Sequence, residues 1–436
     1  MSHYRAYPAY KDSGVEWLGK VPSHWEIAPL WSVYRPVKRT GFTKEPLLSV
    51  YRDYGVVLKA SRDDNHNRAS DDLDPYQLVE PGQLVTNKMK TWQGSIAVSE
   101  LRGIVSPAYF VYEPIRNVIG RFIHHLMRCR PYIIGYMSVS KGIRVGQWDL
   151  DPDHFRTFPV LFPPKEEQEW IVKALDRETA RIDALISKKT EFIELLAKKR
   201  QALITHAVTK GLNPDVRMKD SGVEWIGEVP EHWSVQPIKY LACIGNGSTP
   251  NKDNGKYWEN GTFPWLTSGC VNLDEVICAE QYVTEAALIE CHLPIIAPPA
   301  VLVGITGQGK TRGMATTLKI EATINQHIAF LKPISKNIHI GFLRSFLEAA
   351  YNWLRFDSEG VGSTKGAITC EQLANTRIAM PPLAEQQSIL AFIDRQSDRT
   401  ARLQSKTQLS IDLLRKRRSA LITAAVTGQI DLRESV

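Results

Sequence analysis

The sequence predicts an α+β fold in which two globular mixed α/β blocks are separated by two long helices that form an antiparallel coiled coil, with an internal pseudo-twofold duplication. The first observation is that residues 11–30, KDSGVEWLGKVPSHWEIAPL, recur as residues 219–238 with 13 of 20 positions identical. The second is that residues 163–209 align without a gap to residues 381–427. The third is a long stretch without Gly or Pro after each block.

The repeat divides the 436 residues into two copies of one unit, each a globular block followed by a helical segment. A chain of this length exceeds what one hydrophobic core usually holds, so more than one domain is expected. The expected segments are block 1 at 1–158, the first helical segment at 159–211, block 2 at 212–377 and the second helical segment at 378–436.

Each helical segment has the start and stop signals of one very long helix. Residues 165–210 and 383–427 contain no Gly or Pro, and each run follows a Pro-Pro pair and ends at Gly211 or Gly428. About 45 residues correspond to roughly 65 Å of helix. Apolar side chains recur at steps of three and four residues, which favours packing along the whole length. Since block 2 lies between them, the two helices are expected to pack antiparallel, with the blocks at opposite ends; separate surface helices are the alternative.

The blocks differ greatly in sequence between their matching ends, yet both mix strand and helix signals. Residues 82–100 and 300–320 are β-rich runs with Gly turns. Residues 121–130 and 341–356 are short helical candidates. A mixed α+β class is therefore expected for each block.

The run VLVGITGQGKT at 301–311 contains the G-x-x-x-x-G-K-[ST] pattern of phosphate-binding loops. That loop needs a helix directly after Lys-Thr, so that the helix N-terminus and its N–H groups can hold the phosphates. Here Gly313 and the pair Thr316-Thr317 follow instead, which favours a hairpin return strand. No later apolar strand ending in Asp follows to hold magnesium. A nucleotide-binding protein is thus kept only as an alternative.

Residues 84–99 of block 1 align opposite residues 302–317 of block 2, and both turns place Lys near Gly and near polar or aromatic residues. Lys, Arg and Gln side chains contact phosphates and base edges in nucleic acids. The candidate contacts in these turns are Lys88, Lys90, Trp92 and Gln93 in block 1, and Gln308, Lys310 and Arg312 in block 2.

A second Gly-Lys turn recurs before each long helix, in SVSKGIRVGQW at 138–148 and in SEGVGSTKGAIT at 358–369. A solvated surface loop is the alternative interpretation of both turns. The candidate phosphate or base contacts here are Lys141, Arg144, Gln147 and Trp148 in block 1, and Ser363, Thr364 and Lys365 in block 2.

The charge distribution limits how DNA could be bound. The chain carries a net charge of +7, which permits an anionic partner. Residues 211–382, however, contain 14 basic and 17 acidic side chains, so block 2 has to bind DNA through local patches. The basic runs 198–200 and 415–418 could contact phosphates, but a solvated helix face is the favoured interpretation.

No catalytic set is found in the sequence. His24 and His232 lie in the duplicated V-P-x-H-W, and with no recurring carboxylate, Ser or Cys beside them we expect a structural turn packed by Trp25 and Trp233. No metal site is predicted, because the cysteines lack ligand spacing. The sequence has no apolar run of membrane-spanning length and no signal-peptide pattern, so a cytoplasmic protein is expected.

The duplicated KDSGVEWLGKVPSHWE and KDSGVEWIGEVPEHWS, the helix starts PPKEEQEWIV and PPLAEQQSIL, and the helix ends KKRQALITHAVT and RKRRSALITAAVT closely resemble the specificity subunit of type I restriction-modification enzymes. The resemblance spans essentially the whole chain. The blocks between these motifs match only in general layout, so the DNA target is not predicted.

The resemblance implies a non-catalytic DNA-binding subunit with two target recognition domains, one for each half of a bipartite site, and two helices that act as a ruler between them. It also implies assembly with two methyltransferase subunits and with restriction subunits. S-adenosylmethionine, ATP and magnesium would then be bound by the partners, and no cofactor by this chain. A coiled-coil scaffold that makes no DNA contact is the alternative.

Overall fold

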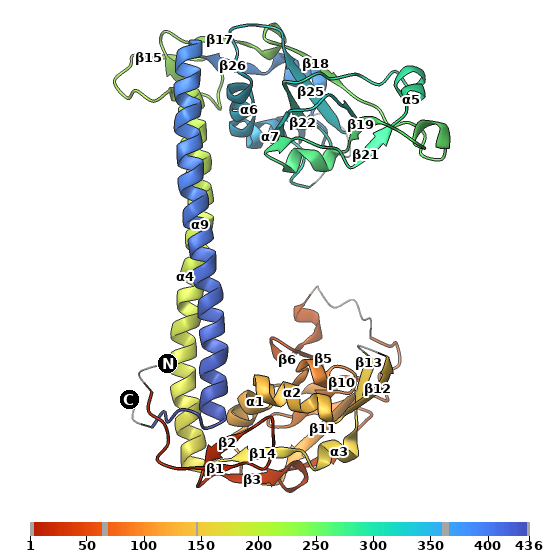
Figure 1. Cartoon of the computed structure of the whole chain (residues 1–436), viewed down its shortest axis with the longest axis vertical. Helices are drawn as coiled ribbons and strands as arrows, with labels where there is room; N and C mark the ends of the chain where they lie inside the picture. The colour runs from red at the N-terminus through yellow and green to blue at the C-terminus, as the bar shows by residue number, and fades with distance from the viewer. Residues whose placement is uncertain (1–3, 63–68, 145–146, 308, 360–365, 434–436) are drawn as a thin grey trace. The chain divides into compact units, whose positions relative to one another are not determined.

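The computed structural model describes residues 4–62, 69–144, 147–307, 309–359 and 366–433 (Figure 1). The chain forms two compact units. Each unit contains one block and roughly half of each long helix. Unit 1 comprises Met1–Thr190 and Gln408–Val436, and unit 2 comprises Glu191–Thr407.

The two predicted long helices are confirmed as α4 (Lys165–Lys210) and α9 (Leu383–Val426). Each is followed by a glycine in the left-handed region, Gly211 with φ 77° and Gly428 with φ 72°. A residue without Cβ adopts this conformation at low cost, which is why glycine ends both helices.

Block 1 is built on a four-stranded antiparallel sheet of order β4-β11-β8-β9, on which helix α1 packs. The strands of unit 1 are β1 (Tyr10–Asp12), β2 (Lys20–Pro22), β3 (Glu26–Pro29), β4 (Tyr34–Val37), β5 (Leu48–Tyr51), β6 (Gly55–Leu58), β7 (Gln77–Val79), β8 (Leu84–Asn87), β9 (Ile96–Val98), β10 (Gly103–Val105), β11 (Tyr109–Pro114), β12 (Ser140–Arg144), β13 (Gln147–Leu150) and β14 (Pro159–Phe162). The helices of block 1 are α1 (Gly120–Arg128), α2 (Arg130–Ser138) and α3 (Pro152–Arg156).

Block 2 has a five-stranded sheet of order β18-β25-β22-β23-β20 and a three-stranded sheet of order β21-β19-β24. The strands of unit 2 are β15 (Met218–Asp220), β16 (Glu228–Pro230), β17 (Ser234–Pro237), β18 (Ala242–Asn246), β19 (Phe263–Leu266), β20 (Glu275–Val276), β21 (Gln281–Val283), β22 (Ala300–Gly304), β23 (Ala315–Leu318), β24 (Thr323–Ile324), β25 (Ile328–Pro333) and β26 (Arg377–Met380). Its helices are α5 (Glu285–Glu290), α6 (Ile340–Ala349), α7 (Tyr351–Glu359) and α8 (Cys370–Asn375).

The duplication extends into the blocks, although their sequences differ. Strands β4, β11, β8 and β9 are arranged like β18, β25, β22 and β23. The central hairpins share one register, since Leu84 pairs with Val98 in block 1 and Leu302 pairs with Thr316 in block 2. The α+β fold with internal duplication is therefore confirmed.

The duplicated V-P-x-H-W turn attaches each block to both long helices. In unit 1, Trp25 Nε1 donates to Glu167 Oε1 near the start of α4 over 2.9 Å. The same ring lies 3.2 Å from where a Cβ at Gly428, after the end of α9, would be. The start of one helix and the end of the other therefore meet at Trp25, as antiparallel packing requires. His24 also contacts Glu167, at 2.8 Å, so the turn has the predicted structural role.

Unit 2 repeats this attachment with the helices exchanged. Trp233 Nε1 donates to Glu385 Oε2 near the start of α9 over 3.1 Å. Its ring lies 3.2 Å from where a Cβ at Gly211, after α4, would be. Arg200 of α4 donates to Ser397 of α9 over 3.1 Å. The predicted antiparallel pairing is thus present within each unit.

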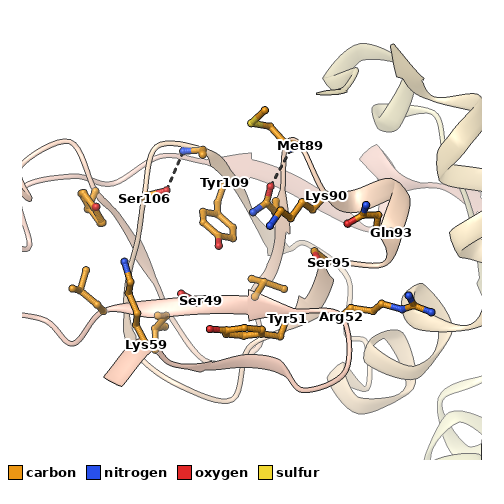
Figure 2. Close-up of a pocket in the computed structure, with 16 residues that line it drawn as sticks. Ser49, Tyr51, Arg52, Lys59, Met89, Lys90, Gln93, Ser95, Ser106 and Tyr109 are labelled. Carbon is orange, nitrogen blue, oxygen red and sulfur yellow. Dashed lines mark hydrogen bonds between the residues drawn. The ribbon is translucent and has the colours of Figure 1, made fainter. Parts of the chain in front are cut away.

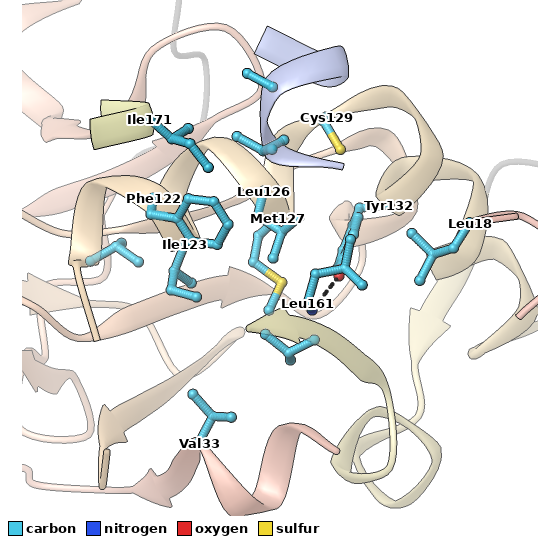
Figure 3. Close-up of a cluster of buried hydrophobic side chains, with 14 of the residues drawn as sticks. Leu18, Val33, Phe122, Ile123, Leu126, Met127, Cys129, Tyr132, Leu161 and Ile171 are labelled. Atoms are coloured by element: carbon cyan, nitrogen blue, oxygen red, sulfur yellow. Dashed lines mark hydrogen bonds between the residues drawn. The ribbon is translucent and has the colours of Figure 1, made fainter. Parts of the chain in front are cut away.

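The core of unit 1 joins block 1 to the long helices (Figure 3). Phe122 and Leu126 of α1, Tyr132 of α2 and Ile171 of α4 are almost fully buried together. The Tyr132 hydroxyl accepts from the Leu161 N–H over 3.0 Å, which satisfies its polar atom in the apolar interior. Burying one such side chain stabilises the fold by about 1.5–3 kcal/mol, so block 1 and these helix segments form one cooperative core.

A second pair of duplicated residues places the block helices. Gln168 Oε1 accepts from the Ile119 N–H at the start of α1 over 3.1 Å. Gln386 Oε1 accepts from the His339 N–H at the start of α6 over 2.8 Å. Helix α6 is therefore the counterpart of α1, with residue 340 in the place of residue 120.

Candidate nucleic-acid interface

The first predicted loop connects β8 to β9 through the short 3-10 helix Thr91–Gln93. Thr91 is buried, and its hydroxyl donates to the Asn87 carbonyl over 2.6 Å. Gly94 ends the turn at φ 94°, a conformation that favours glycine. The buried Thr91 therefore fixes the backbone of the loop, while the side chains of Lys90 and Gln93 are exposed.

The second predicted loop of block 1 lies against the first. The Leu150 N–H at the end of β13 donates to the Lys88 carbonyl over 2.8 Å. The rings of Trp92 and Trp148 lie 5.2 Å apart between centroids. The Lys88 ammonium lies 4.7 Å from the centroid of the Phe110 ring. Two turns predicted separately in the sequence thus form one surface.

The second loop of block 1 also contains an ion pair. Lys141 pairs with Asp151, and hydrogen bonds from Lys141 and then His154 lower the pKa of that carboxyl. Lys141 therefore has a carboxylate partner within its own domain. The side chains of Arg144 and Gln147 lie outside the described residues.

Block 2 brings its two predicted loops together in the same way. The Ile368 N–H donates to the Ile305 carbonyl over 2.8 Å, and Thr306 forms a β-bridge with Ala367. Lys310 is exposed, and its carbonyl accepts from the Tyr351 hydroxyl over 2.9 Å. Four predicted contacts lie outside the described residues, namely Gln308, Ser363, Thr364 and Lys365.

The Gly-Lys-Thr run forms a hairpin turn, as predicted, and not a phosphate-binding loop. Strand β22 pairs antiparallel with β23, and the Gly313 N–H donates back to the Gly304 carbonyl over 2.7 Å. After Lys310 the described chain continues as a turn into β23, with no helix whose N-terminus could hold a phosphate.

Arg312 has a different environment from the other predicted contacts. It is only 3% exposed. A Cβ at Gly366 would lie 1.7 Å from its Nη1, so the guanidinium packs directly against the backbone of the second loop. This position suits a residue that supports the two loops from beneath. As DNA contacts, Arg312 and the other candidates stay predictions.

A pocket of about 730 Å³ opens beside the first loop of block 1 (Figure 2). Lys90 and Gln93 line it together with side chains that the sequence did not single out. Figure 2 shows Ser49 and Tyr51 of β5 along one side, with Met89, Lys90 and Tyr109 along the other. The lining side chains missed in the sequence include Tyr51, Arg52, Lys59, Tyr76, Asn87 and Tyr109.

The pocket combines the side-chain types that recognise nucleic-acid bases. Arg and Lys contact guanine O6 and N7, and Asn and Gln pair with adenine N6 and N7. Tyrosine rings offer apolar surface and a hydroxyl. No periodic signal could have revealed Arg52 or Tyr109, because each follows or begins a strand in a different part of block 1.

In block 2 a chain of hydrogen-bonded polar side chains lies beside the equivalent hairpin. Thr249 Oγ1 contacts Gln326 Oε1, and Gln326 Nε2 lies 3.2 Å from His327 Nε2. His327 Nδ1 in turn lies 2.7 Å from Thr306 Oγ1 in the hairpin loop. Gln326 and His327 are exposed and the two threonines are half-buried. These groups are able to donate and accept, so they extend the candidate interface of block 2.

Within the described ranges, no group of three His, Cys, Asp or Glu residues is placed to hold a metal ion. None of the helices in that part of the chain combines the length and apolarity needed to cross a bilayer.

The sequence is similar to those of known proteins. Residues 230–412 match the family model of the type I restriction modification DNA specificity domain. The chain is 23% identical over 434 residues to the type I restriction enzyme MjaVIII specificity subunit of Methanocaldococcus jannaschii, a match that covers 94% of each chain. Residues 230–412 thus match the type I DNA specificity domain, and the chain is similar over nearly its whole length to a type I specificity subunit.

Other specificity subunits match over shorter lengths. The chain is 23% identical over 264 residues to the EcoR124I/EcoR124II specificity subunit of Escherichia coli, which covers 59% of the chain and 59% of that subunit. The match thus spans about three fifths of that relative's length.

Two solved structures share the fold. A chain from a structure on complex assembly and conformational transition of the type I R-M system superimposes with a TM-score of 0.65 at 17% identity, covering 93% of this chain and 98% of that chain. The HsdS subunit from Thermoanaerobacter tengcongensis superimposes with a TM-score of 0.52 at 18% identity, covering 94% and 98%. At these identities the likeness concerns the fold alone.

Proposed function

We propose that this chain is a type I specificity subunit that recognises a bipartite DNA site, with block 1 binding one half and block 2 the other. The observation that supports this most directly is the shared hairpin register of the two blocks. Two domains with one backbone plan but different loop side chains suit the recognition of two different half-sites.

The recognition surface of block 1 is the pocket beside the first loop. Lys90, Gln93 and Arg52 present the donors and acceptors that distinguish base edges in the major groove. Each well-placed pair of hydrogen bonds to a base discriminates by about 1–3 kcal/mol.

The equivalent surface of block 2 is the hairpin loop with Lys310 and the polar chain around Gln326 and His327. The net acidic composition of residues 211–382 makes non-specific phosphate attraction weak there. Hydrogen bonds to bases therefore carry a larger share of the binding in block 2.

The chain acts in this proposal as a non-catalytic scaffold in the cytoplasm. Two methyltransferase subunits bind it through its duplicated helix segments, and restriction subunits join the complex. S-adenosylmethionine, ATP and magnesium are bound by those partners. The duplication supports this stoichiometry, because a twofold repeat in one chain offers the same surface twice.

The proposal is tested by co-expressing the chain with its methyltransferase subunit in a host without adenine methylation and mapping methylated adenines by sequencing. A gapped two-part motif that disappears when this chain is omitted is the expected result. Genomic DNA that stays unmethylated although the complex assembles would contradict the recognition role.

A further inference from the structure

A second cavity, of about 430 Å³, lies in unit 1 between block 1 and the C-terminal part of α9. The turn after β5, helix α1 and helix α9 form its walls. Its lining includes four guanidinium groups and two imidazoles, from Arg52, Arg121, Arg128, Arg418, His124 and His125. The carboxylates in the lining are those of Asp53 and Glu100, so cations outnumber anions.

Two of the four arginines have carboxylate partners on helix α4. Arg121 Nη2 lies 2.8 Å from Asp176 Oδ1. Arg418 Nε lies 2.9 Å from Asp183 Oδ1. Arg418 thus has a carboxylate partner although its side chain is 38% exposed. These pairs fix the two guanidinium groups at the rim of the cavity.

Arg128 has no such partner in the described part of the chain. Its Nη2 donates to the carbonyl of Arg52, and its Nη1 lies 3.4 Å from His124 Nε2. Burial lowers the pKa of Arg128, and the positive charge of Arg418 lowers it further against the opposing effect of Asp53. The charge of Arg128 is therefore held in a partly buried site without a counterion in contact.

Burial and neighbouring groups also lower the pKa values of the two histidines in the cavity. Burial, and then the charge of Arg128, lowers the pKa of His124 to about 4. Burial, followed by His124 and Arg121, lowers the pKa of His125 to about 3. Both imidazoles are therefore neutral near pH 7, and an anion in the cavity would favour their protonation.

Block 2 has a carboxylate at the corresponding place. With residue 340 matched to residue 120, Glu348 takes the place of Arg128 and Arg344 that of His124. Glu348 Oε1 lies 2.7 Å from Arg200 Nη1, and its Oε2 lies 3.7 Å from Arg344 Nη2. Arg200 is the counterpart of Arg418 in the duplicated helix end. Block 2 thus carries its own anion between two guanidinium groups, whereas block 1 has the cation of Arg128 at that position.

We propose that the cavity of block 1 binds a phosphate group of the DNA backbone between Arg128, Arg121 and Arg418. The phosphate takes the role that the Glu348 carboxylate has in block 2. Guanidinium groups donate paired, charge-assisted hydrogen bonds to phosphate oxygens, which makes arginine well suited to such a site.

DNA is the source of this phosphate because the cavity adjoins the pocket proposed to recognise bases. Arg52 lines both, so a strand bound at the pocket has backbone within reach of the cavity. This inference rests on the proposed function. A phosphate bound here adds affinity without sequence preference and anchors one end of the recognised strand.

The test measures DNA affinity of the complete complex with its methyltransferase subunits at several salt concentrations. Arg128→Gln is expected to weaken binding to target and non-target DNA equally and to reduce the slope of log affinity against log salt by about 1. Arg415→Gln is the matched control, because it removes the same charge from an exposed position of α9 outside the cavity. Arg121→Gln, at the rim, provides a second variant if Arg128→Gln fails to fold.

DNA with single phosphates replaced by neutral methylphosphonates identifies the source of the anion. At one position the replacement is expected to weaken binding by the wild type but not by Arg128→Gln. An unchanged salt slope in Arg128→Gln and Arg121→Gln overturns the inference. Two other results, each with an unchanged salt slope in Arg128→Gln, would also overturn it. Stabilisation of unit 1 by inorganic phosphate alone would identify a free anion as the ligand, and loss of methyltransferase association in the variant would identify a contact with that subunit. If wild-type complex shows no target preference at all, the proposed function itself fails.

Discussion

The attachment of the blocks to the long helices should differ in strength between the two units, and this can be measured. Trp25 is fully buried and donates to Glu167, which is itself 5% exposed. In Glu167→Ala the indole N–H loses a charged acceptor where water cannot replace it, at a cost of about 2–3 kcal/mol. In unit 2 the side chain of Glu385 is 29% exposed, so water can reach the Trp233 N–H in Glu385→Ala and the loss is about 1 kcal/mol or less.

Hydrogen–deuterium exchange of the intact complex reports both attachments in one experiment, because exchange follows local opening free energies. Peptides from 11–30 should exchange about a hundredfold faster in Glu167→Ala, since about 1.4 kcal/mol corresponds to a factor of ten. The exchange rate of peptides from 219–238 should rise by no more than about fivefold in Glu385→Ala. Equal acceleration in the two units, or a larger change in unit 2, would refute the reasoning from burial.

Three further predictions concern single side chains. The wild-type chain and Lys310→Ala should show the same absence of ATP binding in equilibrium dialysis, because a hairpin follows Lys310; ATP binding that Lys310→Ala abolishes would restore the nucleotide-binding alternative. The free energy of unfolding of unit 1 should be highest above about pH 6.5 and fall toward pH 4. The reason is that histidines in the unfolded state, with their ordinary pKa of about 6.5, bind protons that folded His124 and His125 do not. Thermal melts at pH 7 and pH 5 check this, and a His124→Asn variant that is equally acid-sensitive would contradict it. Glu348→Gln should destabilise unit 2 by about 1–2 kcal/mol, since it leaves Arg200 and Arg344 without their shared carboxylate. It should also steepen the salt dependence of DNA binding. An unchanged midpoint of urea unfolding would argue against a structural ion pair.

The long helices could be predicted from the sequence because their signal is local. Two runs free of Gly and Pro, each followed by a glycine, define α4 and α9 to within a residue of the observed ends. The duplicated motifs likewise predicted structural turns packed by Trp25 and Trp233, but not the contacts of these turns with the long helices. The shared sheet order of the blocks was less accessible, since it depends on strand pairing between residues far apart, such as Tyr112 with Pro36.

The candidate site was only partly predictable for the same reason. The loop residues Lys90 and Gln93 were found because Lys-containing turns recur in the aligned hairpins. Tyr51 and Tyr109 reach the same pocket from segments with no common pattern. The burial of Arg312 was not foreseen either, since a turn in the sequence gives no sign of a second loop packing over it.

The most direct test of the central claim is to map methylated adenines with the chain altered in one block at a time. The double variant Lys90→Ala, Gln93→Ala should relax or change one half of a gapped motif and leave the other half and the spacer intact. Lys310→Ala should affect the opposite half only. If either change alters both halves together, or neither variant changes the motif while methylation persists, recognition of separate half-sites by the two blocks is contradicted.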